Sequence, residues 1–299
     1  MLRSIRHIPH SSTEIPANYR EPFLLSDAGL ERELLRMTDS YTDELFGGDA
    51  EGALVFPVSR LLVDVERFEN DEEEVMAARG MGALYTRTHE LQPLRRDLIP
   101  EAREELLSRY YRPHHAKLEA MVEDSLERFG QALIIDCHSF PSRRLPYEIA
   151  AEGDTRPEIC IGTDSFHTPE WLRDAAVECF AKAGFTVGID TPFSGALTPA
   201  KHYRQEKRIC SLMIEVRRDL YMDEETGEKS VRFSGVRKIL ETVIQRLEER
   251  TRGKSPASCP HPPQSPVHPN PRPLRHPKLM PPRSLRIVSN AGRLELENF

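Results

Sequence analysis

Two apolar runs, each followed by side chains that can bind metal or move protons, constrain the fold of this chain most. The run 132–135 leads into Asp136 and His138, and the run 212–214 ends at Glu215. Short continuous apolar runs are typical of strands buried in a parallel sheet. Since open parallel sheets bind their ligands at the carboxyl ends of the strands, we expect these polar side chains to lie together.

A third strand end lies near the N-terminus, where the run 4–8 leads into Pro9 and His10. His10, His138 and Glu215 are the parts of a mononuclear zinc hydrolase: two imidazoles for the metal and a carboxylate that takes a proton from its water. A carboxylate is expected as third ligand, because three protein ligands leave the fourth position to water.

Elsewhere helical and strand patterns alternate, which predicts an α/β fold: a mostly parallel, mixed sheet with helices on both faces. The helical pattern at 27–46 could break near Thr38 and Asp39, and Pro113 interrupts the one at 97–128 because proline lacks an amide hydrogen. Strands are further expected at 58–65, 83–86, 132–137, 158–161, 185–189 and 209–215, and helices at 70–79, 169–183 and 234–250.

Composition changes near residue 252 and divides the chain into two parts. The segment 253–299 holds 11 of the 24 prolines and carries a net charge of +5, which predicts a disordered, basic tail. An anionic partner or a proline-binding groove could recognise it, and its partner is unknown. The folded part, 1–252, carries a net charge of −12 and should repel nucleic acid.

Other features favour a cytoplasmic protein that does not enter membranes. No apolar stretch approaches the roughly 18 residues that span a bilayer, and no apolar secretion core follows the first four residues. The five cysteines, an odd number spread over a long chain, fit reduced thiols better than a disulfide framework.

Taken in order, the polar motifs resemble the N-formylglutamate amidohydrolase family over about residues 5–250. The motifs are Pro9-His10-Ser11-Ser12 with Ile15-Pro16, Thr38-Asp39, Ser59-Arg60, the run 63–67, Asp136-Cys137-His138-Ser139, and Glu215 with the run 220–224. The same order is similar to that of the zinc carboxypeptidases. The resemblance implies a catalytic domain over 1–252 with a zinc-carboxypeptidase-like fold.

The resemblance also implies particular roles in the site. It places an aspartate after a threonine, so His10, Asp39 and His138 are predicted to bind one Zn²⁺, and Glu215 to act as general base. Asp136 could instead orient a histidine from outside the ligand set. Four other carboxylates remain alternatives for the third ligand: Glu14, Asp43, Asp64 and Glu66.

Substrate recognition calls for arginine, because an N-acyl amino acid offers a carboxylate that a guanidinium group binds in two-pronged fashion. Arg60 and Arg67 suit this role by position, and Arg87, Arg95, Arg217 and Arg218 are reserves. Glu66 stands where the family usually has asparagine, which leaves the exact substrate open. In a strand, Glu66 would point away from Arg67.

We therefore predict zinc-dependent hydrolysis of an N-formyl or related N-acyl amino acid by metal-activated water. Two alternatives remain. One is a carboxypeptidase-like hydrolase of small peptides, and the other is a metal-free binding protein that keeps the same fold.

Overall fold

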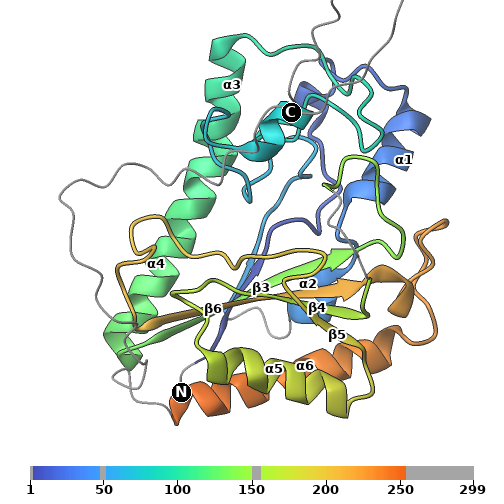
Figure 1. The fold of residues 1–299 in the computed structure, drawn as a ribbon. Helices are drawn as coiled ribbons and strands as arrows, with labels where there is room; N and C mark the ends of the chain where they lie inside the picture. Colours follow the sequence, from blue (N-terminus) through green and yellow to red (C-terminus); the bar gives the residue numbers. More distant parts are fainter. Residues whose placement is uncertain (1–2, 48–51, 150–155, 254–299) are drawn as a thin grey trace, which may run out of the picture. The chain divides into compact units, whose positions relative to one another are not determined.

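The computed structural model describes residues 3–47, 52–149 and 156–253, which are built around a six-stranded sheet (Figure 1). In order across the sheet, the strands are β2 (Ala53–Val55), β1 (Ile5–Ile8), β3 (Ala132–Phe140), β6 (Ile209–Arg217), β4 (Ile159–Gly162) and β5 (Val187–Ile189). β2, β1, β3 and β6 are parallel, β4 is antiparallel to β6, and β5 is parallel to β4. This mixed, mostly parallel sheet confirms the predicted fold class.

The strands that carry the longest apolar runs, β3 and β6, form the centre of this sheet. Every residue of β3 is buried, and in β6 only Arg217 is partly exposed. Their pairing extends from Ala132 beside Ile209 to Phe140 beside Arg217. Parallel strands at the centre of a sheet have no solvent face, which explains their continuous apolar sequence.

Helices cover the two faces of the sheet unequally. On one face, α5 (Glu170–Lys182) and α6 (Phe233–Arg252) lie side by side (Figure 1), and α2 (Thr42–Gly47) packs against α6. Alternate residues of β3, from Leu133 to Cys137, belong to the apolar cluster on this side. This face is therefore closed by the main hydrophobic core.

The opposite face is covered by helix only over the first half of β3. Here α4 (Arg112–Phe129) packs against Ala132 and Ile134. Because side chains alternate between the two faces of a strand, the next residues on this face are Asp136 and His138. On this face, the apolar side chains of β3 that α4 covers are therefore followed by polar side chains that α4 does not cover.

A second apolar cluster holds the segment 56–94 against α1 (Asp27–Met37) and α3 (Pro100–Leu106). The strands predicted at 58–65 and 83–86 are wrong, since both segments run as turns and bends. Residues 58–65 are all buried within this cluster, which surrounds them without any strand partner. A short apolar run reports burial, and burial alone does not require a strand.

The helical pattern at 27–46 is broken where the sequence indicated. α1 ends at Met37, Thr38 takes an extended conformation, and α2 begins at Thr42. The short connection between the two helices carries Asp39.

The helical region 97–128 is also irregular. A π-helical turn, Leu107–Tyr111, joins α3 to α4, and Pro113 lies in the first turn of α4, where its missing amide is tolerated. The acidic helix expected at 70–79 is present only as a 3₁₀ helix, Val75–Arg79. The last four predicted strands are present as β3, β4, β5 and β6, and the last two predicted helices as α5 and α6, whereas the three-residue β2 was not predicted.

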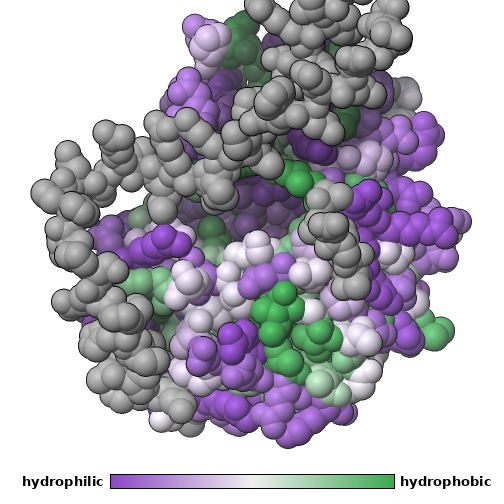
Figure 2. Space-filling view, in the orientation of Figure 1, coloured by the Kyte–Doolittle hydropathy of each residue, from purple (hydrophilic) through white to green (hydrophobic). Residues whose placement is uncertain are grey.

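The predicted tail at 253–299 lies outside the described residues, apart from Gly253. Within the described part of the chain, no helix combines the length and apolar character that crossing a bilayer needs. Hydrophilic side chains predominate on the face shown in Figure 2, with small apolar patches between them.

Candidate metal centre and active site

Four polar side chains share the sheet face that α4 leaves partly uncovered. β1 and β3 place His7 beside Asp136, and β3 and β6 place His138 beside Glu215. His10 follows the end of β1. The side chains expected after the apolar runs therefore come together, because parallel strands in register present neighbouring positions to the same face.

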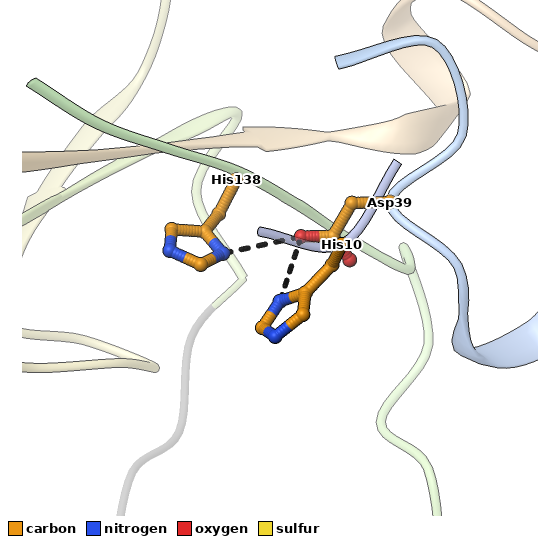
Figure 3. Close-up of side chains that lie close together, drawn as sticks. All are labelled: His10, Asp39 and His138. Carbon is orange, nitrogen blue, oxygen red and sulfur yellow. Dashed lines mark hydrogen bonds and ion pairs between the residues drawn. The ribbon is translucent and has the colours of Figure 1, made fainter. Parts of the chain in front are cut away.

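His10, Asp39 and His138 form a buried cluster in which two imidazoles face one carboxylate oxygen (Figure 3). Asp39 Oδ2 lies 3.2 Å from His138 Nδ1 and 3.6 Å from His10 Nδ1. His10 Nδ1 has no hydrogen-bond partner among the described residues. A buried nitrogen without a partner is costly, and here it points where a cation would supply one.

The backbone and Arg218 fix the orientation of Asp39. The amide of Asp39 donates to the carbonyl of His10 at 2.9 Å, and the amide of Ser139 donates to Asp39 Oδ2 at 3.2 Å. Arg218 Nη2 donates to the other oxygen, Oδ1, at 2.9 Å. Oδ2 is thereby left facing the two imidazoles.

Further carboxylates lie behind both histidines. His10 Nε2 is hydrogen-bonded to Asp64 Oδ1 at 2.8 Å. His138 Nε2 lies 3.1 Å from Asp136 Oδ1 but is not aligned for a hydrogen bond. A carboxylate on the far nitrogen holds an imidazole so that its near nitrogen faces a metal. Asp64 thus orients His10 through a hydrogen bond, whereas Asp136 lies close to His138 Nε2 without forming one.

The alternatives for the third ligand occupy other places. Glu14 and Asp43 are exposed, and Asp64 lies beyond His10. Glu66 Oε2 is 4.0 Å from His138 Nε2, on the side of the ring opposite to Asp39. Among these carboxylates, Asp39 is the one whose oxygen faces both Nδ1 atoms.

Beside this cluster lies a second group, formed by His7, Glu66 and Asp136. His7 Nδ1 is 2.8 Å from Asp136 Oδ1 and 3.1 Å from Glu66 Oε1, and His7 Nε2 is 2.8 Å from His114 Nε2. Glu66 therefore turns into the site, contrary to the direction expected of a strand residue, because no strand forms there. Sequence patterns did not indicate His7, although a histidine inside a buried strand needs a polar partner.

Electrostatics in the first cluster favour a positive charge. Burial raises the pKa of Asp39, but His10 and His138 outweigh it and hold this pKa well below its usual range. Burial likewise raises the pKa of Asp64, but His10 and Arg60 outweigh this effect and hold the pKa well below its usual range. Burial lowers the pKa of His138, whereas Asp136 and Asp39 raise it well above its ordinary value. The carboxylates of Asp39 and Asp64 are therefore both ionised, and their negative charge attracts a cation to the imidazoles.

Glu215 stands in a different environment. Burial raises its pKa to about 8, and Oε2 has no hydrogen-bond partner among the described residues. The nearby His138 works against this rise, and a metal ion in the adjacent cluster would lower the pKa further. A buried carboxylate with an unused oxygen beside a cation site is suited to accept a proton.

The arginines predicted to bind substrate differ in how they are held. Arg60 donates from Nη2 to Asp64 at 2.9 Å and from Nε to the hydroxyl of Tyr85 at 3.1 Å. Arg67 has no hydrogen bond at Nε, and its side chain is 21% exposed. Arg67 therefore keeps donor capacity that Arg60 has largely used.

The reserve arginines are already hydrogen-bonded to other groups of the protein. Arg218 is fixed against Asp39, and Arg217 pairs with Asp219 at 2.8 Å. Arg87 and Arg95 donate to the backbone carbonyls of Leu91 and Leu62.

The fold and the site define a member of the N-formylglutamate amidohydrolase family: the model of that family matches residues 2–222, and the chain belongs to it. N-formylglutamate deformylase of Pseudomonas putida is 26% identical over 172 residues, which are 56% of this chain and 62% of that protein. The chain thus matches less than two thirds of that relative's length.

Two solved structures share the architecture. The N-formylglutamate amidohydrolase from Ralstonia eutropha JMP134 has a TM-score of 0.72 and 25% identity, covering 84% of this chain and 95% of its own. A gene product of Agrobacterium tumefaciens has a TM-score of 0.52 and 20% identity, covering 82% and 91% respectively, and shows the fold alone.

The contact between His10 and Asp64 leads to a test of metal affinity. If the cluster binds zinc through His10, Asp64→Asn should weaken that binding by about 10- to 100-fold, since the amide holds His10 less firmly in this orientation. A competition titration with a chromophoric chelator measures this. Glu33→Gln is the matched control, because Glu33 is also buried and bonded to a histidine, His89, at 2.6 Å. Equal affinity in both variants would contradict the orienting role of Asp64.

Proposed function

We propose that this chain hydrolyses the amide bond of an N-formyl or related N-acyl amino acid, with Zn²⁺ bound by His10, Asp39 and His138. The observation that carries the proposal is the convergence of two imidazole Nδ1 atoms on one carboxylate oxygen, with Glu215 on the neighbouring strand. Membership in the family and the names of the relatives support the reaction class.

The donor set fits zinc. Two imidazole nitrogens and one carboxylate oxygen are typical ligands of catalytic zinc, which keeps a further position open. All three residues are buried, and the unpartnered His10 Nδ1 gains its missing partner from the metal. The ionised Asp39 offsets part of the charge that such an ion would bring.

Amide hydrolysis needs help because an amide carbon is a poor electrophile and neutral water a poor nucleophile. A bound zinc ion supplies Lewis acidity and lowers the pKa of water to about 7. Glu215 takes the proton of the attacking water and passes it to the leaving nitrogen. The water oxygen bonds to the amide carbon and the C–N bond breaks, which yields a carboxylate and a free amine.

Glu215 suits the proton transfer by position and by environment. It lies beside His138 in the pairing of β3 with β6, so it faces the same side of the sheet as that proposed ligand. Its Oε2 is free of hydrogen bonds among the described residues. The stiff central strand keeps it within the site.

Arg67 is the proposed partner of the substrate carboxylate. Its Nε lies 4.0 Å from Asp64 Oδ2 and has no hydrogen-bond partner among the described residues, and burial of most of the side chain strengthens a charged hydrogen bond. Arg60, held by Asp64 and Tyr85, keeps Nη1 3.7 Å from Asp39 Oδ1 and adds positive charge near the proposed ligands. Glu66 faces His7 instead of Arg67, so it does not neutralise the guanidinium through an ion pair.

The ligand assignment predicts a loss of metal. His10→Ala should bind one zinc fewer per chain than the wild type and should lose amide hydrolysis, because a three-ligand site is reduced to two. Metal analysis after dialysis and an assay with N-formyl amino acids measure both effects. His89→Ala, which removes a histidine bound to Glu33, is the control. Unchanged zinc in His10→Ala would overturn the assignment.

A second prediction separates proton transfer from metal binding. Glu215→Gln keeps the shape of the side chain but removes its basic oxygen, so kcat should fall roughly 100- to 10,000-fold while bound zinc stays unchanged. Steady-state kinetics and metal analysis on the same preparation test this. Near-native kcat would exclude Glu215 as the general base.

Arg67→Ala should mainly raise KM, because the carboxylate contact is made equally in the ground and transition states. The expected cost in kcat/KM is about 2–4 kcal/mol. N-formyl amino acid amides, which lack the carboxylate, should react equally with wild type and variant. Arg217→Ala, which breaks a surface pair with Asp219, serves as the control. An equal loss on both substrates would show that Arg67 does not bind the carboxylate.

A further inference from the structure

We propose that His7, Glu66 and Asp136 form a second divalent-cation site beside the first, with Nε2 of His138 as its fourth ligand. This goes beyond the proposed function, which needs one metal ion. In this arrangement His138 bridges two ions as an imidazolate, and its remaining N–H proton is released to water when the second ion binds. Its Nδ1 faces Asp39, and its Nε2 faces Asp136.

The spacing of the ligand atoms suits a cation. His7 Nδ1 lies 2.8 Å from Asp136 Oδ1 and 3.1 Å from Glu66 Oε1. Ligand atoms about 2.1 Å from a small divalent ion are roughly 3 Å apart along the edge of an octahedron. The three atoms can therefore contact one ion with only small side-chain movements.

The two clusters differ in which residues balance the negative charge of their carboxylates. Arg218 and Arg60 pair with Asp39 and Asp64 at 2.9 Å. Among the described residues, no arginine or lysine forms an ion pair with the carboxylate of Glu66 or Asp136. Both carboxylates form ion pairs with histidines, and Asp136 also accepts a hydrogen bond from the amide of Leu197. Two largely buried carboxylates without a fixed cation match the charge of one divalent ion.

The imidazoles present the right atoms. His7 Nε2 is hydrogen-bonded to Nε2 of His114 at 2.8 Å, and when His7 is the donor, its Nδ1 lone pair points at the two carboxylates. In neutral His7, a lone pair that faces two anions is unfavourable unless a cation lies between them. His138 is only 4% exposed, and its Nε2 lies 3.1 Å from Asp136 and 4.0 Å from Glu66 without an aligned hydrogen bond. It is a buried donor atom aimed into the same group.

Zinc stoichiometry of the full chain tests the proposal without reference to activity. The protein is stripped with a chelator and titrated with Zn²⁺, and bound zinc is counted by mass spectrometry. The wild type should bind two ions per chain and His7→Ala one. Glu66→Gln keeps the shape of the side chain and should bind the second ion at least tenfold more weakly. His138→Ala should bind neither ion tightly.

Two controls make the outcome decisive. His89→Ala should keep both ions, and His10→Ala should lose the first ion but keep the second, so failure of the first site is distinguishable from failure of this one. Saturation of the wild type at one ion would overturn the proposal and would leave His7 as a protonated bridge between carboxylates. Two ions retained in both His7→Ala and Glu66→Gln would overturn it as well.

Discussion

The parallel pairing of β3 with β6 is the constraint on which the site depends. Both strands are buried along their length, so one set of alternate side chains must enter the core formed with α5 and α6. The other set starts beneath α4 and then reaches Asp136, His138 and Glu215. A shift of one residue in either strand would send its polar groups into the core, so the packing that stabilises the sheet also sets the chemistry of its edge.

Asp39 and Asp64 can be buried close together because each has a charged arginine within contact distance. Asp39 and Asp64 form ion pairs with arginines and lie beside histidines, so their pKa values stay low despite burial. Removing one partner of such a pair costs more than the pair contributes. The site is therefore a preorganised set of charges in which the Nδ1 atoms of His10 and His138 both face Asp39.

The arginines of this site differ in how many of their donors have hydrogen-bond partners in the protein. Arg60 and Arg218 have carboxylate partners fixed by the fold, and their remaining donors reach protein groups. Arg67 keeps an unused donor at the border of the cluster. The proposed separation of structural from substrate-binding arginines rests on this difference in partners, which residue type alone does not reveal.

The sequence alone determined the elements whose patterns are local: the apolar runs of β3 and β6, the break before Asp39, and hence the edge where the histidines and Glu215 meet. It could not determine the segment 58–65, because turns within a closed apolar cluster bury residues as fully as a strand does. Only the tertiary structure decided that Glu66 turns inward and meets His7. The direction of a side chain in an irregular segment depends on packing against β1 and β3, which the local sequence does not encode.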